Sequence, residues 1–91
     1  MFHVYVLQSA RDGSHYVGSC CNITRRLGEH NSGTSSYTKG RRPWNVVYTE
    51  QFGTRSEAMK RERFLKSGKG RIELKAILSR EMKTVLRYVE G

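Results

Sequence analysis

The segment from residue 15 to residue 33, HYVGSCCNITRRLGEHNSG, concentrates side chains that could do chemistry. It holds a tyrosine, two histidines, two adjacent arginines and two adjacent cysteines. Such a segment could be a solvated basic loop, a metal-binding knuckle or one wall of a catalytic pocket. Arg26 and His30 are four residues apart, so on a helix their side chains would share one face.

The adjacent thiols of Cys20 and Cys21 do not favour the metal-binding knuckle. No second pair of cysteines or histidines stands at the spacing of a zinc site. A disulfide between neighbouring residues is strained and closes no useful loop. We therefore expect both cysteines to be reduced thiols at the end of a strand.

The charge balance indicates an anionic partner. Lysine and arginine number 17 against 8 acidic residues, which gives a net charge of +9 in 91 residues. That field favours a polyanion, usually nucleic acid, although solubility or a ribosome-associated role would also account for it. No apolar run approaches the ~18 residues of a membrane span. The N-terminus lacks the basic start and apolar length of a signal peptide. We expect a cytoplasmic protein without membrane contact.

Alternating apolar residues predict a β-hairpin at the N-terminus. In FHVYVLQ, Val4 and Val6 fall on one face of a strand, and Tyr5 and Leu7 on the other. The sequence RDG predicts a turn, and SHYVGS a second strand. A glycine at position 18 indicates a bulge or a close approach of another group.

Asn22 is suited to cap a helix in which Ile23 and Leu27 face the core. Residues 31–42 are rich in serine, threonine, glycine and basic side chains, which predicts a loop. The third strand is predicted over residues 43–52. Its large apolar residues share one parity and should share one face: Trp44, Val46, Tyr48 and Phe52.

The sequence TRSE at residues 54–57 is a capping box that predicts a helix to about Lys66, with a stop at Gly68. Ala58, Glu62 and Leu65 form one stripe of that helix. A carboxylate on such a stripe is costly to bury unless it is paired or bound to a cation. Glu62 is thus either a cation ligand or a salt-bridge partner at the helix edge.

A last helix is predicted from about Arg71 to the C-terminus, with helical spacing of apolar residues up to Met82, Val85 and Leu86. The element order β-β-α-β-α-α predicts an α+β fold. We expect one domain over residues 1–91, built on a three-stranded antiparallel sheet flanked by helices.

These residues together resemble the GIY-YIG nuclease superfamily, and in particular its small, single-domain bacterial members. The resemblance rests on VYV at 4–6, YVG at 16–18, an arginine ten residues after Tyr16, and EH before an Asn-x-Gly loop. YTKGRRPW and SEAMKRERFLKSGKGR extend it downstream. It is strongest over residues 2–78, and residues 79–91 would be a C-terminal helical extension.

The resemblance implies the identity of the catalytic residues. They would be Tyr5, Tyr16, Arg26, His30 and Glu62, with Glu62 as the ligand of a Mg²⁺ or Mn²⁺ ion and Glu57 as its rival if the helix is shifted. The first motif reads Val-Tyr-Val rather than Gly-Ile-Tyr, and Ser19 stands where some relatives have a lysine. An asparagine that several relatives carry on the last helix has no clear counterpart.

The implied chemistry is phosphodiester hydrolysis. An activated water attacks the phosphate, Arg26 binds phosphate oxygens with its forked N–H donors, and a tyrosine takes the proton of the water. We favour Tyr5 as the base and Tyr16 as its positioning partner. Other side chains are expected to track the nucleic-acid backbone: Gly18, Arg25, Lys39, Arg41 and Arg42. We expect Tyr37 to pack under the loop.

The leading interpretation is a divalent-metal-dependent endonuclease acting on DNA, rather than RNA, with a structured or single-stranded substrate and a role in DNA repair. The alternative is a nucleic-acid-binding or protein-interaction module that keeps the nuclease fold with little turnover. We expect a monomer, and a protein partner could supply substrate specificity.

Overall fold

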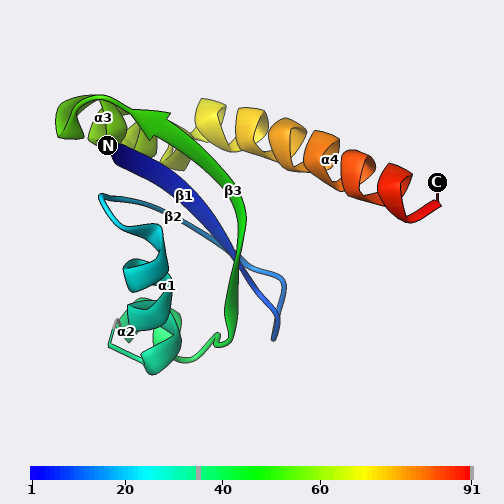
Figure 1. Cartoon of the computed structure of the whole chain (residues 1–91), viewed down its shortest axis with the longest axis horizontal. Helices are drawn as coiled ribbons and strands as arrows, with labels where there is room; N and C mark the ends of the chain where they lie inside the picture. Colours follow the sequence, from blue (N-terminus) through cyan, green and yellow to red (C-terminus); the bar gives the residue numbers. More distant parts are fainter. Residues whose placement is uncertain (35, 91) are drawn as a thin grey trace.

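The computed structural model describes residues 1–34 and 36–90, and for Ser36 and residues 81–90 it describes the backbone alone. It confirms the predicted α+β fold, with three strands and the helices around them (Figure 1). In chain order the elements are β1 (Phe2–Ser9), β2 (His15–Cys20), α1 (Ile23–Ser32), α2 (Ser36–Lys39), β3 (Trp44–Phe52), α3 (Arg55–Lys66) and α4 (Gly68–Glu90).

The sheet is antiparallel with strand order β2-β1-β3, which makes β2 an edge strand. The predicted alternation in β1 is confirmed. Val4 and Val6 pack in a core with residues of α3 and α4, whereas Tyr5 and Leu7 pack in a second core with residues of α1. The two faces of the sheet are therefore covered by different helices.

The prediction that the apolar residues of β3 share one face is wrong. Val6 pairs with Tyr48, but its neighbour Leu7 pairs with Val46, so the register shifts by one residue at this point. Such a bulge reverses the side-chain parity of the strand beyond it. Trp44 and Val46 consequently lie in the core beside α1, and Tyr48 and Phe52 lie in the core beneath α3 and α4.

The helix starts follow their capping residues. The Asn22 side chain accepts a hydrogen bond from the Arg25 N–H at the start of α1, and the Thr54 side chain accepts one from the Glu57 N–H at the start of α3. The region predicted as a loop over residues 31–42 contains the short helix α2. The indole Nε1 of Trp44 donates to the Thr38 carbonyl at 2.9 Å and ties α2 to the start of β3.

α4 starts at Gly68, earlier than the predicted start at Arg71, and directly follows α3. Leu74 and Ile77 are buried on its inner face. The predicted apolar side chains of Met82, Val85 and Leu86 lie outside the described part of the structure. α4 projects past the sheet at its C-terminal end (Figure 1). Among the described residues, no helix combines the length and the apolar character that crossing a membrane requires.

Candidate active site

Two tyrosines of the hairpin lie on the sheet face that is covered by α1. Tyr5 pairs across the strands with Gly18, and Tyr16 pairs with Leu7, so the two rings are diagonal neighbours with centroids 6.3 Å apart. Tyr5 is 1% exposed, whereas Tyr16 lies on the edge strand and is half-buried. Tyr16 is therefore the tyrosine that a solvent molecule can reach.

Gly18 makes room for Tyr5. A Cβ atom at position 18 would lie 2.6 Å from Cζ of Tyr5, which is far inside van der Waals contact. The sequence explanation for this glycine was close approach of nucleic acid. The structure supplies a packing reason instead, because the Tyr5 ring occupies the space that a side chain would need.

His30 is buried behind the tyrosines. Its Nε2 atom lies 3.1 Å from the Tyr5 hydroxyl, and its Nδ1 atom lies 2.9 Å from the Thr38 hydroxyl. Burial, reinforced by the positive charge of Arg26, lowers the pKa of His30 below its ordinary value. The neutral imidazole is thus favoured, and each of its ring nitrogens has a hydrogen-bond partner.

Arg26 lies beside Tyr5 on the solvent side. Its Nη1 atom donates to Glu29 at 2.9 Å, and its guanidinium is near enough to the Tyr5 hydroxyl to lower the pKa of that group. Burial has the larger and opposite effect, so the pKa of Tyr5 is raised to about 12. A buried tyrosine that resists ionisation is a poor proton acceptor, which counts against Tyr5 as the general base.

Glu62 lies on the predicted stripe of α3. Ala58 and Leu65 on the same stripe are buried, and the Glu62 side chain is 24% exposed. The Ser19 hydroxyl donates to its Oε1 atom at 2.6 Å, and the Lys66 ammonium donates to its Oε2 atom at 2.8 Å. The salt-bridge alternative for Glu62 is thus observed, with Lys66 one helical turn away, and the cation-ligand alternative stays a prediction.

Lys66 joins the two halves of the site across the edge strand. Val17 and Ser19 point to the α3 face of β2, and Tyr16 points to the α1 face. The Lys66 ammonium pairs with Glu62 and also lies 5.5 Å from the centroid of the Tyr16 ring. Lys66 therefore connects Glu62 and Tyr16 around the exposed edge of β2, even though these two residues lie on opposite sides of the sheet.

The rival carboxylate, Glu57, is part of the helix cap. Its Oε1 atom lies 2.9 Å from the Thr54 hydroxyl at the start of α3. Among the described residues, no three histidine, cysteine or acidic side chains gather as a metal cluster. Cys20 and Cys21 are free thiols, as predicted.

The basic residues that were expected to track nucleic acid differ in their surroundings. Arg25 is exposed, with Nε 3.6 Å from Glu29. Arg41 pairs with Asp12 at 3.3 Å, while Arg42 donates to the carbonyl of Lys39 at 2.9 Å and stabilises the end of α2. Arg41 and Arg42 thus both have structural roles in the loop.

Tyr37 does not pack under the loop. It is 54% exposed, and its ring centroid lies 5.7 Å from that of Tyr16. The Arg41 guanidinium covers it at 4.9 Å. An exposed aromatic ring therefore stands directly beside the tyrosine pair.

Sequence reasoning missed several residues of this site. Lys66 could have been identified from the sequence, because it follows Glu62 by four residues in a predicted helix, which is the spacing of a stabilising ion pair. Ser19 and Thr38 could not, since their contacts depend on how distant segments pack together.

Comparison with known proteins places these features in a family context. The family model of the GIY-YIG catalytic domain matches residues 1–75. A UPF0213 protein of Halobacterium salinarum is 46% identical over 63 residues, which is 68% of this chain and 80% of that protein. One from Streptococcus pneumoniae is 36% identical over 89 residues, which is 97% of this chain and 89% of that protein.

A solved structure is also similar. The solution NMR structure of a UPF0213 protein from Bacillus halodurans is 36% identical in sequence, with a TM-score of 0.50 and coverage of 85% of both chains. The sequence motifs, the observed fold and these relatives all indicate the family whose model matches residues 1–75.

Proposed function

Because the chain belongs to the GIY-YIG catalytic domain family, we propose that it is a divalent-metal-dependent endonuclease that hydrolyses phosphodiester bonds in DNA. The observation that carries the proposal is the link between Tyr16 and Glu62 through Lys66. It supports the proposal because it brings a tyrosine that could accept a proton close to a carboxylate that could bind a metal ion. Arg26, on the α1 side, adds a forked donor for phosphate oxygens.

Each site residue has a separate role in the proposed hydrolysis. Arg26 binds the scissile phosphate and stabilises the charge that develops on its oxygens. Tyr16, which is half-buried at the sheet edge, accepts the proton of the attacking water. This reverses the preference for Tyr5 from the sequence. Tyr5 and His30 hold the pocket wall, and Tyr5 contacts the Arg26 side chain from within.

Glu62 fits a Mg²⁺ or Mn²⁺ ion as a single-carboxylate ligand. Mg²⁺ keeps several waters and is held by one or two carboxylates together with substrate phosphate, so one glutamate suffices. The bound ion would neutralise charge on the phosphate and on the leaving oxygen. Ser19 holds one carboxylate oxygen in place, and Lys66 occupies the other until it is displaced.

A groove beside the site favours a substrate with unpaired nucleotides. It has a volume of about 1050 Å³ and lies between the sheet and α4. Tyr16 and Tyr37 contribute aromatic rings, and among the described residues of its lining the charged ones are all basic: Lys66, Arg71 and Lys75. Unpaired bases stack on aromatic side chains while cations follow the backbone. Single-stranded or flap-containing DNA suits this groove better than a continuous duplex.

Glu62→Gln tests the proposal, with Glu57→Gln as the matched control on the same helix. Labelled single-stranded, duplex, flap and branched DNA are incubated with Mg²⁺ and with Mn²⁺. Wild type and Glu57→Gln should cut at similar rates. Glu62→Gln keeps the shape, should bind DNA at least as tightly, and should not cut.

The contrary outcomes are distinct. Binding without cleavage of any substrate by the wild type would favour a nucleic-acid-binding module. Cleavage lost in Glu57→Gln and kept in Glu62→Gln would show that Glu57, and not Glu62, is the metal ligand.

A further inference from the structure

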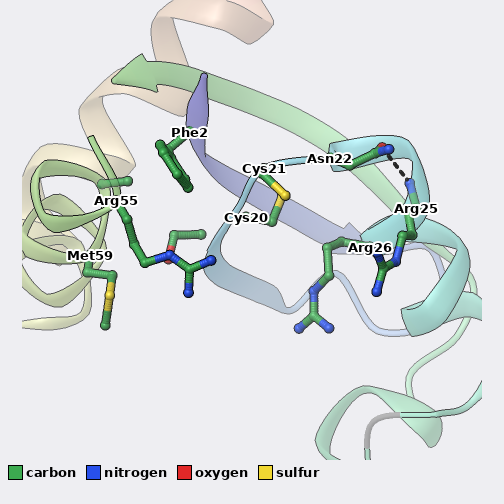
Figure 2. Close-up of a pocket in the computed structure, with 10 residues that line it drawn as sticks. Phe2, Cys20, Cys21, Asn22, Arg25, Arg26, Arg55 and Met59 are labelled. Atoms are coloured by element: carbon green, nitrogen blue, oxygen red, sulfur yellow. Dashed lines mark hydrogen bonds between the residues drawn. The ribbon is translucent and has the colours of Figure 1, made fainter. Parts of the chain in front are cut away.

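A cavity of about 300 Å³ opens beside the catalytic residues, between the first turns of α1 and α3 and the Cys20 end of β2. Among the described residues that line it, three are charged, and all three are arginines: Arg25, Arg26 and Arg55. Figure 2 shows the guanidinium groups of Arg26 and Arg55 entering this space from opposite sides, one from α1 and the other from α3. A space bounded by cations on both sides suits a single anion.

Arg55 is available to a ligand. It is exposed, and its guanidinium lies 5.6 Å from the centroid of the Phe2 ring, which supports the side chain from one side. Among the side chains that the structure describes, no carboxylate lies within ion-pair distance of Arg55. Arg25 and Arg26 share Glu29. Glu29 thus pairs with two of the three guanidinium groups and leaves Arg55 without a carboxylate among the described residues, so the lining of the cavity is positive.

The cavity is continuous with the proposed catalytic centre. Ser19 lines it and donates its hydrogen bond to Glu62. Arg26 lines it and also lies beside Tyr5. An anion bound between Arg26 and Arg55 would therefore be a close neighbour of the scissile phosphate without being the same group.

We propose that this cavity binds the backbone phosphate next to the scissile phosphate, with Arg55 as its principal ligand and Arg26 shared between the two phosphates. The identification of the anion as DNA backbone rests on the proposed nuclease function. Guanidinium groups bind phosphate through two parallel N–H donors, which fixes the orientation of the strand as well as its affinity. The DNA strand then runs along the edge of β2, from this cavity at one end of β2 to the aromatic groove at the other end.

The test uses the full chain without divalent metal, so that no cleavage can occur, and the oligonucleotide dT4 as the probe. In NMR titrations the Nε–H signals of Arg26 and Arg55 should shift with one common Kd. The matched control is Arg63, which is exposed on the same helix and lines neither the cavity nor the groove. Its signal should stay unchanged.

Substitution should give a matching pattern. Arg55→Gln should weaken dT4 binding by roughly tenfold, as expected for loss of a charge-assisted hydrogen bond. It should also reduce the slope of log affinity against log salt by about 0.7. Arg55→Lys should keep the slope and lose part of the affinity, because the charge remains and the fork is lost. Arg63→Gln should change neither quantity.

A chemical change in the probe identifies the contact. Methylphosphonate replacement of one phosphate at a time in dT4 should identify a position that weakens binding in the wild type and weakens it clearly less in Arg55→Gln, where only the contact with Arg26 remains. Failure of dT4 to bind, an unresponsive Arg55 signal, or equal losses in Arg55→Gln and Arg63→Gln would overturn the assignment. These readouts do not involve cleavage. A phosphate site without cleavage of any DNA would overturn the nuclease proposal alone, and cleavage with a silent Arg55 would overturn this site alone.

Discussion

The Tyr5 hydroxyl and the Nε2 atom of His30 lie 3.1 Å apart in a buried contact between β1 and α1. The other ring nitrogen of His30 is engaged by Thr38 at 2.9 Å. Tyr5, His30 and Thr38 thus form one line of polar groups inside the core beside α1. Within it, protonation of His30 would place a positive charge close to the Arg26 guanidinium, at a site where water is largely excluded.

The stability of the protein should consequently fall in mild acid. The folded state lowers the pKa of His30, so it favours the neutral imidazole more than the unfolded state does. This contribution is fully present above the ordinary pKa of about 6.5 and is lost as the pH falls through the lower folded value. Urea unfolding at several pH values between 7.5 and 5 should show a decreasing free energy of unfolding.

His30→Gln is the control for this decrease, because its amide keeps polar contacts and cannot titrate. Its unfolding free energy should be lower than that of the wild type at pH 7.5 and nearly flat down to pH 5. Equal slopes for both proteins would assign the acid sensitivity to other groups.

Gly18→Ala should destabilise the protein through Tyr5. The added methyl would overlap the ring of Tyr5, its direct partner on the neighbouring strand, and overpacking of this kind costs about 1–3 kcal/mol. Thermal and urea unfolding measure the loss. Gly28→Ala, at an exposed helical position where an added Cβ meets no other atom within 4 Å, should be neutral or stabilising. Unchanged stability in Gly18→Ala, combined with weakened DNA binding, would restore the sequence explanation that phosphate passes close to this glycine.

The sequence was sufficient to predict the three strands and the longer helices, and it supplied a set of candidate site residues. Period-two alternation in β1 and the capping residues Asn22 and Thr54 act locally, so the sequence reports them directly. Glu62 was identifiable because a carboxylate between the buried positions Ala58 and Leu65 is unusual.

The features that sequence reasoning missed depend on how distant segments pack. The bulge between Val46 and Tyr48 in β3 depends on the register against β1, and no residue type in the strand announces it. The short helix α2 has the composition of a loop. Tyr5 and Tyr16 are equivalent as residue types, and only their burial separates them, because one lies on the central strand and the other on the edge.

Lys66→Gln should raise the affinity of the protein for divalent metal. The ammonium group now occupies the Oε2 atom of Glu62 at 2.8 Å and has to leave before an ion can bind there. Exposed pairs contribute about 0–1 kcal/mol, so the gain should be at most roughly fivefold. Calorimetric titration with Mn²⁺ measures it, and Lys60→Gln, an exposed lysine of the same helix, controls for the change in net charge. A lower affinity in Lys66→Gln would show that the ion pair instead holds the carboxylate in its ligating position.

Tyr16→Phe and Tyr5→Phe should separate the two tyrosine roles. Tyr16 is half-buried and faces Lys66, so its loss should leave stability nearly unchanged and reduce cleavage by about 10²–10⁴-fold, the usual contribution of a general base. Tyr5→Phe leaves the buried Nε2 atom of His30 without its partner, which should cost about 1–3 kcal/mol of stability. Its cleavage should fall less.

The pH dependence of cleavage distinguishes the tyrosines further. Because burial raises the pKa of Tyr5 to about 12, Tyr5 stays neutral under ordinary assay conditions, and Tyr5→Phe should keep the shape of the wild-type profile. Tyr16→Phe should instead lower the rate at every pH in the range. Rates measured with Mg²⁺ between pH 6 and 9 on the best substrate decide the matter. A profile that changes shape in Tyr5→Phe, together with a wild-type rate in Tyr16→Phe, would return the role of the base to the buried tyrosine, with Arg26 as the group that makes its ionisation accessible.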